Sequence, residues 1–268
     1  MPFLSLSDGD WRIFLRWSRD EGWQIPFQEQ RLFQNQWQPF IFVLKLEGQV
    51  LGFVSAVAYK ESGWIGNLLV DPGRRGRGYG AALLDFALDF LRQLNLRRIW
   101  LTASEAGHPL YQRRGFVAID RVDRWVVTGG GQQELESDTS TTELIDLDRR
   151  CWGESRAPLL SLLADAGHLC CCGETLGLLQ PGVDFWQLGP WLSADKFPRD
   201  SRRLLTQAIE KTVAGKELLV DVLASSEMEL VLRNSRFHKR GSNLLMVLSD
   251  KPVKLDGVIA LASLGSIG

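Results

Sequence analysis

Apolar residues change their spacing along the first half of the chain, from the period of a helix to the period of strands. Trp11, Phe14 and Leu15 follow helical spacing behind Ser7, a candidate helix cap. After a second short helix around residues 28–33, three apolar runs predict strands joined by short turns, the pattern of an antiparallel meander. These runs are residues 40–46, 50–59 and 64–70.

A glycine-rich loop follows the third predicted strand and leads into a long helix. The loop reads DPGRRGRGYG from Asp71, and the helix has an apolar face between Leu83 and Leu91. Beyond this helix the pattern predicts a strand, a short helix and further strand, at residues 99–101, 109–113 and 116–127. The first half therefore reads as one αβ unit.

The second half repeats this unit without a gap over a long stretch. Leu204 lies 121 residues after Leu83, and Phe237 lies 121 residues after Phe116. Strand, loop, helix, strand, helix and strand recur in the same order, which favours two copies of one fold. A chance match of apolar periods is the alternative.

A polar, glycine-rich stretch separates the two copies. It contains almost no apolar residues, which is typical of a linker between domains. The predicted organisation is a first domain at residues 1–128, a linker at 129–142 and a second domain at 143–268.

The composition indicates a globular protein and argues against some partners. Hydrophobic residues make up 45% and charged residues 24%, with 31 basic residues against 32 acidic ones. So small a net charge favours neither nucleic acid nor a membrane surface as a partner. No run approaches the ~18 apolar residues of a membrane-spanning helix, and the start of the chain does not read as a signal peptide. We therefore expect a cytoplasmic protein.

The cysteines and histidines do not predict a metal site. Cys151 stands alone and the other three cysteines are consecutive at residues 170–172, which suits neither a disulfide framework nor the paired ligands of zinc. The three histidines are far apart in the sequence. We expect buried thiols and no metal.

The glycine-rich loop has the chemistry of a diphosphate-binding site. Its glycines keep side chains away from a ligand lying against the main chain, and the following helix adds unpaired N–H groups and its dipole. Its arginines add positive charge. The residues expected to bind are Arg75, Gly76, Arg77, Gly78, Gly80 and Ala81.

Two other phosphate-binding loops fit less well. Gly76, Gly78 and Ala81 satisfy the dinucleotide pattern of the Rossmann fold, but residues 99–103 carry no acidic residue for a ribose. A P-loop is excluded because no Gly-Lys-Ser/Thr follows the glycines.

Two motifs together resemble the GNAT superfamily of N-acetyltransferases. One is the Arg/Gln-x-x-Gly-x-Gly/Ala signature, matched from Arg75 to Gly80 after Val70. The other is Leu-Tyr, three residues and Gly-Phe, matched from Leu110 to Phe116. Glu21-Gly22-Trp23, the meander and the repeat make the chain similar to the tandem two-domain YitH/HolE-like type.

This resemblance implies an α/β (α+β) fold of two tandem domains. Each would have a mixed, mostly antiparallel central sheet flanked by helices, with the second domain degenerate. It also implies acetyl-coenzyme A as the co-substrate. Leu69 and Val70 occupy the strand that binds the pantetheine arm through its backbone, and Ser104 replaces an asparagine that contacts this arm. Tyr111 occupies the position of the acid that protonates the departing thiolate, with a packing role for its ring as the alternative.

The general base stays open at the level of sequence. The family often has a carboxylate on the strand before the loop, where this chain has Gly66 and Asn67. Glu21 or a chain of water molecules could take its place. The candidate residues for the acceptor are Glu21, Trp23, Asn67 and Asp184.

The second copy lacks the groups that would bind the co-substrate. Pro198 removes an N–H donor from its loop, and Leu232 stands where Tyr111 stands in the first copy. We expect this copy to cover the acceptor side of the first domain instead.

The expected activity is acetylation of a primary amine on a small molecule, or, as a variant, on a protein. A noncatalytic acyl-coenzyme A sensor is the alternative from another class of protein. The sequence predicts no particular acyl chain and no particular oligomeric state.

Overall fold

The structure is a computed structural model that describes residues 3–36, 40–131, 140–194 and 198–268. Its first half contains the predicted helices, meander and αβ elements in the predicted order. They are β1 (Phe3–Ser5), α1 (Asp8–Asp20), α2 (Phe27–Arg31), the π-helical turn η1 (Leu32–Gln36), β2 (Ile41–Leu46), β3 (Gln49–Ala58), β4 (Ser62–Val70), η3 (Pro72–Arg74), α3 (Tyr79–Gln93), β5 (Arg98–Ala103), α4 (His108–Gln112) and β6 (Val117–Thr128).

The second half repeats this order from its first helix to its last long strand. Its elements are α5 (Thr141–Trp152), α6 (Ala157–Ala164), β7 (His168–Cys172), β8 (Thr175–Pro181), β9 (Phe185–Ser193), α7 (Pro198–Lys211), β10 (Glu217–Leu223), η4 (Ala224–Ser226), α8 (Glu229–Asn234), β11 (His238–Ser249) and β12 (Val258–Ala260). β6 and β11 begin and end 121 positions apart, the offset that the sequence predicts. Among the described elements of the second half, η4 and β12 have no counterpart in the first.

All the strands form one continuous sheet, in which the two halves exchange a strand. The order is β1-β2-β3-β4-β5-β11-β6-β10-β12-β9-β8-β7. β11 pairs antiparallel with β5 on one side and with β6 on the other, and β6 pairs in turn with β10. The expected fold class, a mixed and mostly antiparallel sheet flanked by helices, is confirmed, but the halves share the sheet instead of each closing its own.

The predicted linker at residues 129–142 falls largely outside the described residues. The described residues before it, Gly129 to Gly131, donate backbone hydrogen bonds to Lys216, Ile209 and Thr212 of the second half. At its other end, α5 already begins at Thr141. The domain boundaries themselves remain a prediction.

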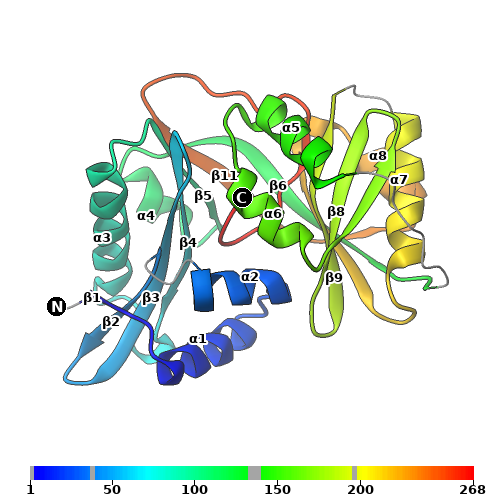
Figure 1. Cartoon of the computed structure of the whole chain (residues 1–268). Helices are drawn as coiled ribbons and strands as arrows, with labels where there is room; N and C mark the ends of the chain where they lie inside the picture. The colour runs from blue at the N-terminus through cyan, green and yellow to red at the C-terminus, as the bar shows by residue number, and fades with distance from the viewer. Residues whose placement is uncertain (1–2, 37–39, 132–139, 195–197) are drawn as a thin grey trace.

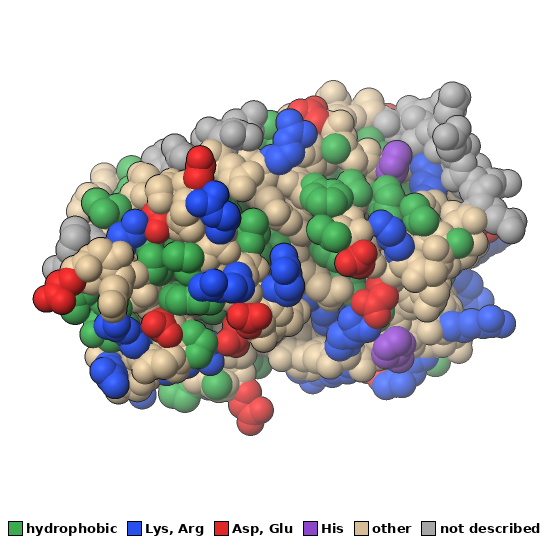
Figure 2. All heavy atoms as spheres, turned by 90° about the horizontal axis from the view of Figure 1, so that it is seen from below, with side chains coloured by type: hydrophobic (Ala, Val, Ile, Leu, Met, Phe, Trp, Pro, Cys, Tyr) green, Lys and Arg blue, Asp and Glu red, His purple; other side chains and the backbone are tan. Residues whose placement is uncertain are grey.

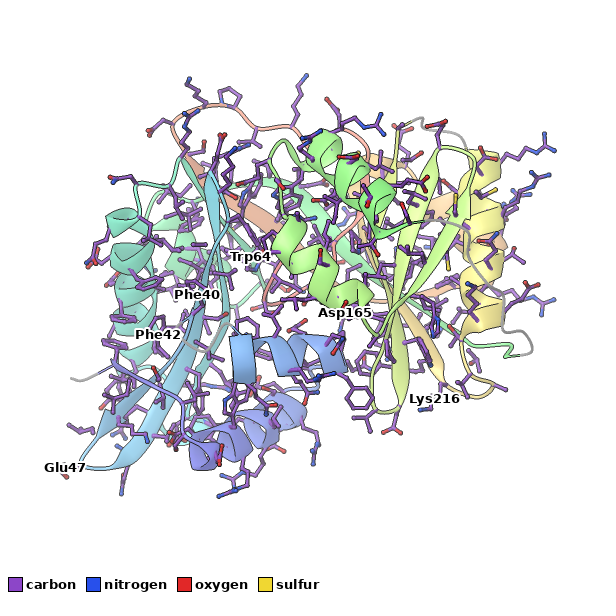
Figure 3. All side chains as sticks on the ribbon, in the orientation of Figure 1. Phe40, Phe42, Glu47, Trp64, Asp165 and Lys216 are labelled. Atoms are coloured by element: carbon purple, nitrogen blue, oxygen red, sulfur yellow. The ribbon has the colours of Figure 1, made fainter. Side chains whose placement is uncertain are left out.

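Helices cover both faces of the sheet (Figure 1). On one face, side chains from α1, α5 and α6 share a single hydrophobic core that runs across both halves. On the other face, α3 and α4 cover the first half while α7 and α8 cover the second, with a separate core under each pair. The shared core includes Trp64 of β4, near the middle of the molecule (Figure 3). Its ring centre lies 6.3 Å from that of Trp152 in α5.

Local sequence explains where the helices beside the cleft begin. Ser7 caps α1 as predicted: its hydroxyl accepts from the N–H of Asp10, whose carboxylate accepts from the N–H of Ser7 in return. α3 begins after Gly78, which adopts a left-handed conformation with φ of 84°. The predicted apolar face of α3 is buried, and the helix packs on β3 and β4.

The exchanged strand predicts that neither half folds without the other. Residues 1–131 alone would lack β11, the strand that lies between β5 and β6 in the sheet. The edges of β5 and β6 that face β11 would then have no hydrogen-bonding partner. We expect this fragment to show no cooperative unfolding transition, and to gain one when it is mixed with residues 140–268. Thermal unfolding followed by circular dichroism measures both. A monomeric fragment that unfolds cooperatively near the melting temperature of the whole chain would contradict this expectation.

Candidate active site

Two neighbouring strands of the first half diverge and open a gap in the sheet. β4 and β5 run parallel but pair only at their starts, where Ser62–Trp64 face Arg98–Trp100. β4 goes on pairing with β3 as far as Val70. The register between β3 and β4 shifts near Phe53, opposite the segment in which Asn67 has a φ of 50°. Beyond Trp64, therefore, no described strand pairs with the β5-facing edge of β4.

A cleft of about 670 Å³ lies at this gap. It brings together seven of the ten residues predicted for the co-substrate and for catalysis, and three of the four predicted for the acceptor. They are Leu69, Val70, Arg75, Gly76, Gly80, Ser104 and Tyr111 for the first group, and Glu21, Trp23 and Asn67 for the second. Arg77, Gly78 and Ala81 belong to the same loop and helix start but do not line the cleft.

The glycines of the loop are required by the backbone and leave space for a ligand. Gly76 and Gly78 have φ values of 76° and 84°, which a side chain would strain. A Cβ at either position would meet no described atom within 4 Å. No described side chain caps α3, so the N–H groups of its first turn are free to bind an anion. These features fit a diphosphate lying against the loop.

Arg75 and Glu21 form an ion pair at the mouth of the cleft. Glu47, in the turn between β2 and β3, lies at the lower edge of the molecule (Figure 3). β3 starts at this edge, and β4 runs antiparallel to it, so β4 ends at the same edge. Figure 2 shows the molecule from this side. Basic and acidic side chains are interspersed on that face (Figure 2). A phosphate bound at the loop would compete with the Glu21 carboxylate for Arg75. Because Glu21 is already paired, it is a poor candidate for a free base.

Tyr111 has the environment of a proton donor. It projects from α4, is 8% exposed, and packs edge-on against Phe116 at 6.2 Å between ring centres. Burial raises the pKa of its phenol to about 12, which keeps the hydroxyl protonated throughout the physiological range. No described residue forms a hydrogen bond with this hydroxyl.

Asp184 is the predicted site residue that the structure leaves away from the cleft. It lies exposed in the turn between β8 and β9, and does not line the cleft. The sequence analysis missed other lining residues: Glu29, Arg124, Asn243, Ser263, Leu264 and Gly265. Three of them belong to residues 263–265, which carry no motif. Together with Asn243 they show that the second half walls part of the cleft, as expected for its covering role.

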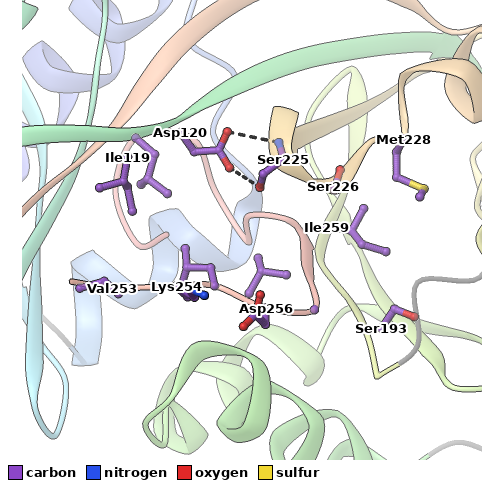
Figure 4. A pocket seen from close by; sticks show the side chains of 14 residues that line it. Ile119, Asp120, Ser193, Ser225, Ser226, Met228, Val253, Lys254, Asp256 and Ile259 are labelled. Carbon is purple, nitrogen blue, oxygen red and sulfur yellow. Dashed lines mark hydrogen bonds between the residues drawn. The ribbon is translucent and has the colours of Figure 1, made fainter.

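The corresponding gap in the second half is filled by the chain itself. β9 and β10 also pair in parallel at their starts, over residues 185–188 and 217–220. Farther along, β12 lies between them and pairs with both strands. The remaining cavity measures about 220 Å³ and is partly walled by residues 253–259 (Figure 4). Within it, Ser225, the counterpart of Ser104, is hydrogen-bonded to Asp120. Pro198, which was expected to remove an N–H donor from the corresponding loop, is the first residue of α7.

Residues 6–116, which contain both predicted motifs and most of the cleft, match the acetyltransferase (GNAT) family. This region of the chain therefore belongs to the GNAT acetyltransferases. The chain is 26% identical to a holothin acyltransferase from Pseudoalteromonas over 79% of this chain and 75% of that one. It is 27% identical to the bS18-alanine N-acetyltransferase of Escherichia coli over 34% of this chain and 65% of that one.

The fold is shared with GNAT structures over both halves. A Pyrococcus horikoshii protein assigned as an acetyltransferase superposes on the whole chain with a TM-score of 0.78, over 94% of its own length and at 18% identity. A GCN5-related N-acetyltransferase from Sphaerobacter thermophilus gives 0.67 over 96% of this chain and 98% of its own, at 12% identity. None of the described helices is long and apolar enough to cross a membrane. Among the described residues, no group of His, Cys, Asp and Glu is arranged to hold a metal ion.

The left-handed conformation of Gly78 predicts a specific loss of binding. Gly78→Val should distort the loop and weaken the affinity for coenzyme A by at least about tenfold, because the N–H groups of the loop would lose their alignment. Gly215→Val is the matched control, since Gly215 has a φ of 80°, has no described atom near its Cβ position, and lies outside the cleft. Isothermal titration calorimetry on both variants measures the difference. Equal affinities for the two variants would contradict the assignment of the loop.

Proposed function

We propose that this GNAT protein transfers an acyl group from acetyl-coenzyme A, or a related acyl thioester, to a primary amine of a small molecule. The observation that carries the proposal is the position of Tyr111: a protonated phenol lines the same cleft as the glycine-rich loop. The loop would hold the diphosphate, and the open edge of β4 would hold the pantetheine arm.

The residues of the cleft account for much of the chemistry of such a transfer. A neutral amine must attack the thioester carbon, forming a carbon–nitrogen bond, and the carbon–sulfur bond must then break. Tyr111 gives its proton to the departing sulfur and regains one from the positively charged nitrogen of the intermediate, which becomes the neutral amide nitrogen. A backbone N–H on the β5-facing edge of β4, beyond its pairing with β5, would stabilise the oxyanion of the intermediate.

A small acceptor is favoured by the second half of the protein. Residues 263–265 and Asn243 line the cleft together with Asn67, a proposed acceptor residue, and would limit the size of an acceptor bound there. The similarity to the holothin acyltransferase also extends over most of this chain, whereas the similarity to the bS18-alanine N-acetyltransferase covers about a third of it. A wall of this kind favours a small molecule over a folded protein as the acceptor.

Thiol release from acetyl-coenzyme A over a panel of small amines tests this function. We expect at least one amine to accelerate thiol release and to be recovered as its amide, detected by mass spectrometry. Binding of acetyl-coenzyme A without turnover of any amine would instead indicate the sensor alternative, which the absence of a carboxylate at Asn67 favours. Turnover of peptides but not of small amines would overturn the proposed acceptor class.

Replacing Tyr111 tests the proposed acid directly. Tyr111→Phe should lower kcat by about 10²- to 10⁴-fold, the usual range for general acid–base catalysis, while the dissociation constant of acetyl-coenzyme A changes little because the ring still packs on Phe116. Steady-state kinetics and calorimetry measure the two quantities. Tyr79→Phe, which removes another hydroxyl from the cleft lining, serves as the control. Full turnover by Tyr111→Phe between about pH 6 and 9 would mean that the tyrosine is structural.

A further inference from the structure

A buried carboxylate on α2 faces the cleft with one oxygen unused. Glu29 is 2% exposed and is one of the residues that line the cleft. Its Oε1 accepts a hydrogen bond from the hydroxyl of Ser266, and Oε2 accepts none from any described residue. Buried carboxylate oxygens are usually satisfied, so an unused one beside a substrate cleft needs an explanation.

The segment that contains Ser266 links Glu29 to the place on β4 where the carboxylate was expected. Asn67 donates its backbone N–H to the carbonyl oxygen of Gly265 at 3.1 Å. A Cβ at Gly66 would overlap that carbonyl and the Cα of Ser266, so glycine at position 66 is what allows this segment to lie against β4. Ser266 then reaches from β4 to Glu29. A carboxylate from α2 is thus linked, through Ser266 and Gly265, to the positions on β4 where one was expected.

Glu29 and Tyr111 approach the gap from opposite faces of the sheet. Tyr111 belongs to the core under α3 and α4. α2 lies on the other face, where Gln28 donates to the carbonyl oxygen of Leu162 in α6 at 3.2 Å. An amine that enters from the α2 side would meet the thioester carbon in the gap, while the sulfur leaves toward Tyr111. This arrangement separates a base for the nucleophile from an acid for the leaving group.

The surroundings of Glu29 make it a stronger base than an exposed glutamate. Burial raises the pKa of its carboxyl above the ordinary value, against the lowering effects of Ser266, Ser263 and the Arg124 guanidinium on β6. Asp221 of β10 also raises this pKa, although it is itself paired with Arg124. Glu29 also raises the pKa of Tyr59, which lies next to β3. The elements α6 and β8, which pack on α2, contain no charged residue.

We propose that Glu29 is the general base of the reaction. Its Oε2 would take a proton from the ammonium group of the acceptor, releasing the neutral amine that attacks the thioester carbon. The second proton of the nitrogen passes to the sulfur by way of Tyr111, and Glu29 returns its own proton to solvent after the amide leaves. This inference rests on the proposed acyl transfer to an amine.

The pH dependence of turnover distinguishes a base from a buried structural carboxylate. In the wild type, kcat should fall as the pH drops through the raised pKa of Glu29, and so above the ordinary glutamate value of 4.5. Glu29→Gln should lower kcat by about 10²- to 10⁴-fold near pH 7, with little change in the affinity for coenzyme A. It should also remove the fall of kcat at low pH, the acid limb of the pH profile. The assay uses acetyl-coenzyme A and the amine of the panel that releases thiol fastest.

Two further variants keep the test independent of folding. Ser266→Ala removes a hydrogen bond that lowers the pKa of Glu29, so the acid limb should move to higher pH while the plateau is retained. Glu154→Gln is the matched control: Glu154 is also buried, but both of its oxygens accept hydrogen bonds, from Ser62 and Glu61, and it does not line the cleft. It should lower stability without moving the acid limb.

The outcomes separate this inference from the proposed function. A wild type that turns over an amine, together with a Glu29→Gln variant that keeps the acid limb and the rate, would overturn the role of Glu29 alone. An unmoved acid limb in Ser266→Ala would do the same. A wild type that releases no thiol with any amine would contradict the acyl transfer itself, and with it the need for a base.

Discussion

The structure depends on backbone pairing between the two halves through β11. This strand belongs to the second half by sequence but lies between β5 and β6 of the first, and β6 in turn pairs with β10. The second half therefore supplies β11, which pairs with two strands of the first half, and the first half supplies β6, which pairs with two strands of the second. Unpaired backbone groups in the middle of a sheet are costly, so we expect the two copies to fold as one unit.

The exchange also explains why the two gaps in the sheet differ. After β11 the chain crosses the second half, where β12 fills the divergence of β9 and β10. It then reaches the first half, where Gly265 meets Asn67 of β4 and Leu264 accepts from the Thr102 hydroxyl of β5. The chain after β11 thus closes the gap between β9 and β10 but lines only one end of the gap between β4 and β5. The open end of the first gap keeps the glycine-rich loop and Tyr111.

Sequence alone predicted the parts of the site that local motifs encode. The loop glycines, Leu69, Val70 and Tyr111 were found because each lies within a few residues of a recognisable pattern, and the offset of 121 predicted the order of the second half. Glu29 was missed because its partner, Ser266, is 237 residues away and neither belongs to a motif. The period of β11 predicts a strand, but it does not show which half pairs with that strand. Asp184 was expected to line the cleft between the two copies, but the turn between β8 and β9 holds it outside.

We propose that one gap, in the first half, binds the acyl thioester while the second half shapes the acceptor side. The most direct measurement is a crystal structure with a nonhydrolysable thioether analogue of acetyl-coenzyme A. We expect one molecule per chain, with its diphosphate on the loop at residues 76–80 and its acyl carbon in the gap between β4 and β5, flanked by Tyr111 and Glu29. A molecule bound between β9 and β10, or an acyl group remote from both side chains, would contradict this proposal.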